Sequence, residues 1–207
     1  MNLLTKERTD FLRRLLAFTS ADKAVSDNLC TSFGSFSSIF EAPPEKLMRV
    51  AGMTEERAAL IALLPAIVRR ALTERHPLPK RIDDPALADH LTARYFALSE
   101  EMLTVIFADK SGKILDLREY GDLHSDTVST RISSIAETAV AIGANQLIWA
   151  HNHPGGFAIP SANDNAALSM ILAACRDLGI TVYDHIIIAD DDYVSIKESV
   201  KERTNER

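Results

Sequence analysis

The chain has 207 residues, 46% of them hydrophobic, and a formal net charge of −6 at pH 7. This length can bury an ordinary core in one domain or in two small ones. The acidic balance excludes an electrostatic grip on nucleic acid by the whole molecule. Two cysteines, Cys30 and Cys175, are too few for a disulfide framework. No apolar run suits a secretory signal or a membrane span, so we expect a cytoplasmic protein that does not enter a membrane.

Residues 1–75 are predicted to be helical throughout. Apolar residues recur at helical spacing between Phe11 and Leu16. Pro43-Pro44 suits the start of a further helix, and Thr54 suits the N-cap of the last one. This part carries 11 Lys and Arg against 9 Asp and Glu, a net +2 that leaves −8 for the remainder. It is therefore the side of the chain to which a polyanion would bind, although the charge signal is weak.

Residues 76–84 are predicted to be a linker, because Pro77 and Pro79 disfavour helix and favour an extended chain. Helices and strands then alternate over residues 85–197, and a charged tail, 198–207, is expected to fray. The predicted helices are 85–98, 132–143 and 162–178, and the predicted strands are 102–108, 113–117, 146–150, 181–189 and 193–196. The first two strands form a hairpin. We therefore predict an α/β domain, a mixed sheet layered with helices, preceded by a small all-α domain.

Two histidines follow directly after the predicted strand 146–150. His151 and His153 are two residues apart, and side chains at this spacing in an extended chain point to the same side. Pro154 keeps His153 extended and ends the strand. If the extended geometry continues past Ala150, both imidazoles can reach one metal ion.

A carboxylate completes this set. Asp164 lies in the first turn of the predicted helix 162–178 and can point back toward the end of the strand. Two His and one carboxylate, with the fourth position left to water, are typical of a catalytic zinc site rather than a structural one. Ser161, three residues before Asp164, also forms a helix-capping signature with it, and the two roles are compatible.

Such a site also needs a base that accepts a proton from the water. Glu100 and Glu101 directly precede the apolar strand 102–108. Partial burial there would raise the pKa of a carboxyl group toward a value useful for proton transfer. The alternative for either residue is an ordinary solvated position before a strand.

The spacing of these residues resembles the JAMM motif of the JAB/MPN metalloproteases. The resemblance is carried by His151 and His153, ten intervening residues and Asp164, with Ser161 three positions earlier and a Glu upstream. The match is closer to the bacterial RadC-like JAB-domain proteins, on the segments 150–154, 160–164 and 184–188. It covers residues 85–197 and extends more loosely to the N-terminus.

This resemblance implies a fold and a reaction. The fold is a sheet with helices layered as in the cytidine deaminases, preceded by a helix-hairpin-helix-like region whose hairpin is Gly52-Met53-Thr54. The reaction is hydrolysis of a peptide or isopeptide bond in a peptide or protein substrate. The implied roles are Zn²⁺ binding by His151, His153 and Asp164, base catalysis by Glu101 in preference to Glu100, and donation by Ser161 to the oxyanion.

Three positions leave alternatives open. Thr54 stands where the hairpin usually has its second glycine, which weakens backbone contact with phosphate. Gly155 stands where the family usually has Ser, and this affects the loop more than the ligands. His185, beside Asp184, is either a partner of the metal site or a structural histidine.

Two functions compete. The first is a zinc metallopeptidase or isopeptidase. The second is a DNA-repair-associated binding or docking protein with a non-catalytic zinc domain, since RadC-like proteins carry a DNA-repair name. A net +2 predicts weak or no DNA binding through residues 1–75, whose apolar helices are better suited to a partner or a second copy of the chain in a homodimer. A zinc nucleobase deaminase is excluded, because the sequence has no Pro-Cys-x-x-Cys segment.

Overall fold

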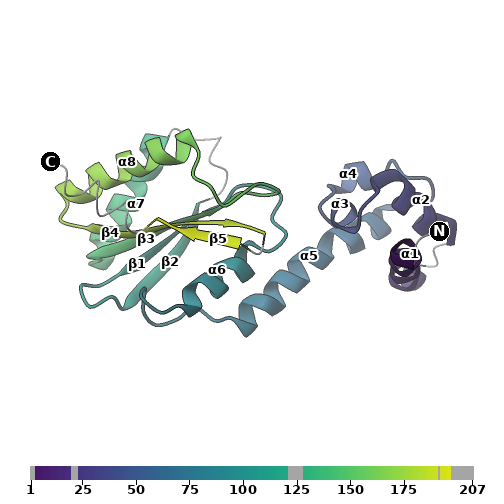
Figure 1. Cartoon of the computed structure of the whole chain (residues 1–207), viewed down its shortest axis with the longest axis horizontal. Helices are drawn as coiled ribbons and strands as arrows, with labels where there is room; N and C mark the ends of the chain where they lie inside the picture. The colour runs from purple at the N-terminus through teal and green to yellow at the C-terminus, as the bar shows by residue number, and fades with distance from the viewer. Residues whose placement is uncertain (1–2, 20–22, 121–127, 191, 197–207) are drawn as a thin grey trace. The chain divides into compact units, whose positions relative to one another are not determined.

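The computed structural model describes residues 3–19, 23–120, 128–190 and 192–196 (Figure 1). The chain divides into two compact units, Met1–Ala71 and Leu72–Arg207. The division falls within the long helix α5, Glu55–Arg75. Within the described ranges, no helix is both long enough and apolar enough to cross a membrane.

The first unit is all helical, as the sequence predicts. Its helices are α1 (Leu3–Leu16), the short 3-10 helix Ala17–Thr19, α2 (Lys23–Phe33), α3 (Phe36–Phe40), α4 (Pro44–Leu47) and α5. Their apolar faces share one core, which includes Leu12, Leu29, Leu47 and Ile61. Pro44 occupies the first position of α4, where a backbone N–H would have no acceptor within the helix, so its absence in proline costs nothing.

The turn between α4 and α5 is held by Gly52 and Arg57. Gly52 has a φ of +85°, and a Cβ there would lie 2.7 Å from Cγ2 of Val25, so glycine is required. Thr54 accepts a hydrogen bond of 3.4 Å from the backbone N–H of Arg57. The Arg57 guanidinium donates to the carbonyl oxygens of Gly52 and Thr19. The Arg57 guanidinium is therefore bonded within the hairpin region itself.

The second unit is an α/β domain around a five-stranded mixed sheet, which confirms the predicted fold class. Its elements are α6 (Ala86–Tyr95), β1 (Leu103–Ala108), β2 (Ile114–Tyr120), α7 (Val128–Ile142), β3 (Gln146–Asn152), α8 (Ala162–Asp177), β4 (Thr181–Ala189) and β5 (Asp192–Ser195). The strand order is β2-β1-β3-β4-β5. Only β3 and β4 are parallel, and α8 makes the crossover that a parallel pair needs.

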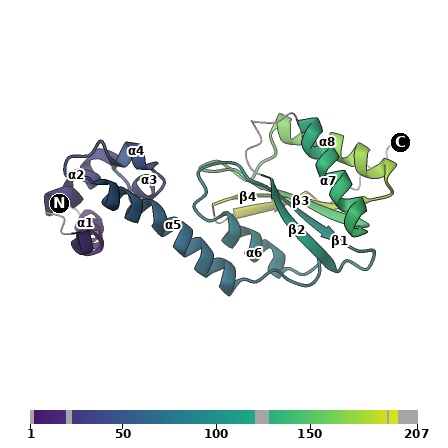
Figure 2. The same ribbon diagram turned by 180° about the vertical axis from the view of Figure 1, so that it is seen from behind.

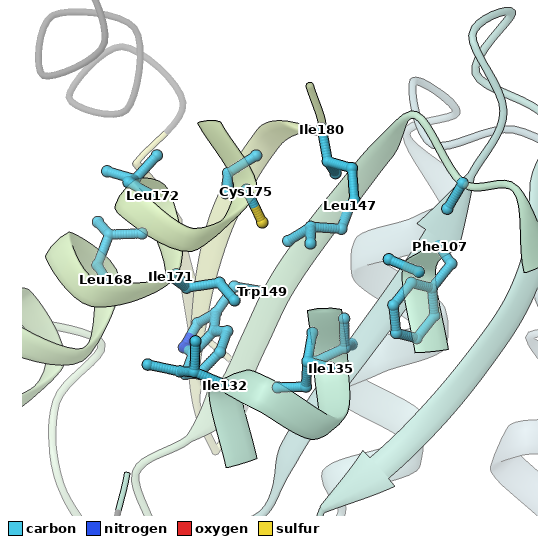
Figure 3. Close-up of a cluster of buried hydrophobic side chains, with 14 of the residues drawn as sticks. Phe107, Ile132, Ile135, Leu147, Trp149, Leu168, Ile171, Leu172, Cys175 and Ile180 are labelled. Atoms are coloured by element: carbon cyan, nitrogen blue, oxygen red, sulfur yellow. The ribbon is translucent and has the colours of Figure 1, made fainter. Parts of the chain in front are cut away.

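Helices cover both faces of this sheet. The helices α7 and α8 lie on one face and α6 lies on the other (Figures 1 and 2). Successive residues of β3 pack alternately into the two hydrophobic cores, one on each face of the sheet, because side chains alternate along a strand. Ile148 and Ala150 pack in the core under α6, whereas Trp149 packs with Ile135 and Ile171 under α7 and α8 (Figure 3). The same alternation puts His151, two residues after Trp149, on the face of the sheet that α8 covers.

Residues 76–84, predicted to be a linker, lie within the second unit and bond to the β1–β2 turn. The N–H of Ile82 donates to the carbonyl of Gly112 at 2.9 Å, and the N–H of Ile114 donates to the carbonyl of Lys80 at 2.8 Å. The Ile82 side chain is buried. The prolines keep this stretch extended, and an extended chain beside a strand edge can pair with it.

Candidate metal centre

The C-terminal end of β3 positions both histidines. This strand lies between β1 and β4 and continues to Asn152, two residues beyond the predicted end. His151 is therefore inside the strand. His153 follows it, and its backbone N–H donates to the carbonyl of Ile188 in β4 at 2.8 Å. Pairing with β4 thus keeps the chain extended through both histidines, which is the condition that the motif requires.

The first turn of α8 positions the carboxylate. Ser161 is the N-cap of α8, and its Oγ accepts a hydrogen bond of 3.1 Å from the backbone N–H of Asp164. The Asp164 Oδ2 in turn accepts a hydrogen bond of 2.7 Å from the backbone N–H of Ser161. This reciprocal capping box fixes the carboxylate on the side of α8 that faces the end of β3.

The three side chains converge on one point. The Nε2 atoms of His151 and His153 are 3.0 Å apart. The Asp164 oxygens lie 3.2 Å from Nε2 of His151 and 3.3 Å from Nε2 of His153. Tetrahedral ligands at ~2.0–2.1 Å from a zinc ion lie ~3.3 Å from one another. The Asp164 distances belong to Oδ1 for His151 and to Oδ2 for His153, so only the Nε2–Nε2 separation compares directly with an edge of such a tetrahedron. One ligand atom from each of the three residues lies within 4.8 Å of the others, so the group can hold one metal ion.

Hydrogen bonds at the far side of each imidazole orient the rings. The Nδ1 of His153 lies 2.9 Å from the carbonyl oxygen of Phe157, so it must carry the ring proton and donate it. The Nε2 of a neutral His153 then has its lone pair free for a metal. The Nδ1 of His151 lies 3.3 Å from Nε2 of His185. Both ligands thus have a defined neighbour on the side away from Asp164.

The Asp164 carboxylate is ionised. Burial alone would raise the pKa of this carboxyl group, but hydrogen bonds with His151 and Ser161 outweigh burial and hold the pKa well below its ordinary value. The site therefore presents one negative charge and two imidazoles. A metal cation would satisfy all three, because metal ligands must be deprotonated.

Asn152 links the metal site to the segment that carries Glu101. The Asn152 Oδ1 accepts a hydrogen bond of 2.7 Å from the N–H of Met102, and its Nδ2 donates to the carbonyl of Glu100 at 3.0 Å. Leu103 pairs with His151 in the register of β1 and β3. Glu101 lies two residues before Leu103, just outside β1 and next to the end of β3 that carries His151. Glu101 is half-buried, whereas Glu100 is exposed.

Comparisons with known proteins identify the family of the chain. A family model described as the RadC-like JAB domain matches residues 82–202. This chain belongs to the RadC-like JAB family. The UPF0758 protein of Cupriavidus taiwanensis is 32% identical over 92% of this chain and 85% of its own length. That of Methylibium petroleiphilum is 31% identical over 82% of this chain and 77% of its own length. The family resemblance found in the sequence is therefore confirmed.

The remaining predicted site residue of this RadC-like chain, Ser161, lies on the exposed rim of the site. Its Oγ uses a lone pair to cap α8, which leaves the hydroxyl proton to donate elsewhere. Among the described residues, no hydrogen bond connects the carboxylate of Glu101 to the three ligands. The structure thus brings His151, His153, Asp164 and Ser161 together and puts Glu101 on the neighbouring strand end.

Two residues of this RadC-like site were not assigned a role by the sequence. Asn152 holds the backbone on both sides of Glu101, and its signal was an amide side chain between the two histidines of the motif. His185 was left open between two alternatives, and the structure puts its ring in contact with His151. The partners of both residues lie 34 to 52 residues away in the sequence, so spacing along the chain could not reveal these contacts.

Proposed function

We propose that the second unit is a zinc-dependent hydrolase of the peptidase type. The observation that carries the proposal is the convergence of two imidazole nitrogens and one ionised carboxylate at separations of 3.0 to 3.3 Å. Three protein ligands leave a fourth position for water, which is typical of catalytic zinc rather than structural zinc. Membership of the RadC-like JAB family supports the same chemistry.

In the proposed mechanism, His151, His153 and Asp164 would hold the zinc ion. When bound, the ion would supply a water whose pKa is lowered toward ~7. The Glu101 carboxylate would accept a proton from the nucleophilic water. The Ser161 hydroxyl donates a hydrogen bond to the oxygen that becomes negative in the transition state. Glu101 then returns the proton to the leaving amine.

A polypeptide substrate is supported by the loop beside the site. Phe157 and Ile159 are 80% and 67% exposed, and they flank Ala158, which is buried. The carbonyl of Phe157 also accepts the Nδ1 proton of His153, so this loop is attached to a metal ligand. Exposed apolar side chains so close to a hydrolytic centre suit contact with the apolar side chains of a peptide or protein.

Metal analysis together with a hydrolysis assay tests this proposal. The purified full chain and the His153→Ala variant are compared for zinc content and for cleavage of a mixed fluorogenic peptide library. We expect about one zinc ion per chain in the unmodified protein and loss of both zinc and cleavage in the variant. Equal zinc content in the two proteins would contradict the site. Zinc binding without cleavage of any peptide or protein substrate would favour the second function.

The second function is a DNA-repair-associated docking protein with a non-catalytic zinc domain. The observation in its favour is the α4–α5 hairpin, in which Gly52 adopts the positive φ that a helix-hairpin-helix turn needs. Against it, Arg57 donates to carbonyl oxygens of the hairpin region itself, and residues 1–75 carry only +2. We propose that DNA binding through this half is weak or absent.

A further inference from the structure

A third histidine lies behind the metal site. His185 is on β4, has 0% of its surface exposed, and its ring centroid lies 5.1 Å from that of His151. The two rings meet through His185 Nε2 and His151 Nδ1, which are 3.3 Å apart. The opposite nitrogen of His151, Nε2, faces His153 and Asp164. His185 is thus separated from the ligand atoms by the width of an imidazole ring.

The position of His151 makes such a neighbour necessary. If Nε2 of His151 binds a cation, the neutral ring must carry its proton on Nδ1, and this buried N–H needs an acceptor. For His153, which follows the end of β3, a loop carbonyl at Phe157 serves. His151 lies inside β3, which pairs with a strand on each side, so the nearby carbonyls are engaged in the sheet. The acceptor for the Nδ1 proton of His151 must therefore be a side chain, and the neighbouring strand β4 provides one.

We propose that His185 is a positioning residue of the metal site, an inference that rests on the proposed cation at His151. His185 accepts the Nδ1 proton of His151 on its own Nε2. This arrangement fixes the tautomer and the ring plane of His151, and it keeps the Nε2 lone pair directed at the cation. Support of this kind for a ligating histidine is worth about 10- to 100-fold in metal affinity.

The end of β5 holds His185 in place. The backbone N–H of His185 donates to the Oδ1 of Asp184 at 2.7 Å, and the hydroxyl of Ser195 donates to the Oδ2 of the same carboxylate at 2.6 Å. The carbonyl of His185 accepts the N–H of Ile196 at 2.8 Å. The last two bonds join β4 to the end of β5 at the level of His185. The backbone N–H and the backbone carbonyl of His185 are thus both hydrogen-bonded.

The test compares apparent zinc affinities of the full chain by competition with a chromogenic chelator at one fixed pH. His185→Leu keeps a buried side chain of similar size and removes the acceptor. His185→Gln puts an amide oxygen near the position of Nε2. His90→Leu is the matched control, because His90 is also buried in this unit but lies on α6, which covers the other face of the sheet.

We expect His185→Leu to weaken zinc binding about 10- to 100-fold, His185→Gln to recover most of the loss, and His90→Leu to bind like the unmodified protein. If His185→Leu fails to fold by circular dichroism, His185→Asn replaces it, since its shorter side chain cannot reach the Nδ1 of His151. Unchanged affinity in the variant that lacks the acceptor overturns the inference.

X-ray absorption of the zinc-loaded protein separates positioning from direct ligation. We expect two imidazole nitrogens at the zinc ion, both in the unmodified protein and in His185→Gln. Three imidazoles in the unmodified protein, falling to two in the variant, would make His185 a ligand and overturn its positioning role. If the unmodified chain itself binds no zinc, the proposed function fails. Zinc binding that does not respond to His185 overturns only this inference.

Discussion

The side-chain oxygen of Asn152 accepts a hydrogen bond of 2.7 Å from the backbone N–H of Met102, 50 residues away in the sequence. The amide nitrogen of the same side chain donates to the carbonyl of Glu100. One buried amide between the two histidines therefore holds the backbone on both sides of Glu101. The proposed metal ligands and the proposed base are thus connected through a single side chain.

The first prediction concerns this amide. Asn152→Ala leaves the N–H of Met102 and the carbonyl of Glu100 without their partner, and it should lower the free energy of unfolding of the second unit by about 1–3 kcal/mol. It should also reduce hydrolysis while zinc is retained. Urea unfolding, zinc content and cleavage rates measure these effects.

The control for this prediction is Asn28→Ala. The side chain of Asn28 also donates to a backbone carbonyl, that of Ala51, but this hydrogen bond is exposed to solvent and lies in the first unit. Water can replace that bond, so a loss of at most about 0.5 kcal/mol is expected. An Asn152→Ala variant as stable and as active as the Asn28→Ala variant would show that the bonds to Glu100 and Met102 are unimportant.

The second prediction separates the two adjacent glutamates. Glu101→Gln should keep zinc and lower the cleavage rate by about 10²- to 10⁴-fold, because it removes proton transfer without removing a ligand. Glu100→Gln is the matched control: its side chain is exposed and only its carbonyl is held by Asn152. We expect it to cleave normally. The opposite result would assign the base to Glu100, and full activity in both variants would leave the base outside this segment.

The local part of the site could be predicted from the sequence, because its geometry depends on rules of short range. Alternation along a strand puts His151 and His153 on one side, and helix capping puts Asp164 at the start of α8. The extension of β3 to Asn152 was not predicted, because it depends on pairing with β4 through Ile188.

The parts that were not predicted are contacts between strands that are distant in the sequence. The contact between His185 and His151 spans 34 residues and exists because β3 and β4 are parallel neighbours. The strand β2 was predicted to end at Leu117 but continues to Tyr120. Its charged end is stabilised by pairing with β1 and by the ion pair of Glu119 with Arg94 at 2.6 Å. These partners lie on other elements of the fold, which the local pattern of a segment does not encode.

The third prediction concerns zinc and stability. A ligand that binds only the folded chain stabilises it, by about 2.7 kcal/mol at a free concentration of 100 times its Kd. We expect zinc to raise the free energy of unfolding of the second unit by this amount and a chelator to reverse the effect. His153→Ala and Asp164→Asn should show no such response. A matched gain in these variants would mean that zinc binds elsewhere.

The last prediction concerns DNA. Proteins that make 6–10 phosphate contacts lose about 10³- to 10⁵-fold in affinity between 50 and 200 mM salt. Residues 1–75 carry a net +2, and the guanidinium of Arg57 is bonded to the carbonyls of Gly52 and Thr19. The Arg57 guanidinium is therefore engaged within the hairpin region and is not available to contact phosphates. We expect the full chain to bind duplex DNA no more tightly than about 10⁻⁴ to 10⁻⁶ M at physiological salt, with a shallow salt slope.

Binding of the full chain to duplex DNA over a salt series measures this, and two variants locate any affinity that is found. Arg49 is exposed beside the α4–α5 hairpin, and Lys80 is an exposed cation of the second unit. If the hairpin held the DNA backbone, Arg49→Ala would weaken binding and reduce the salt slope by about one, whereas Lys80→Ala would not. Tight binding with a steep slope that falls in Arg49→Ala would contradict the expectation and make DNA docking the leading function. A shallow slope that is the same in all three proteins would leave the first unit without a phosphate-binding role.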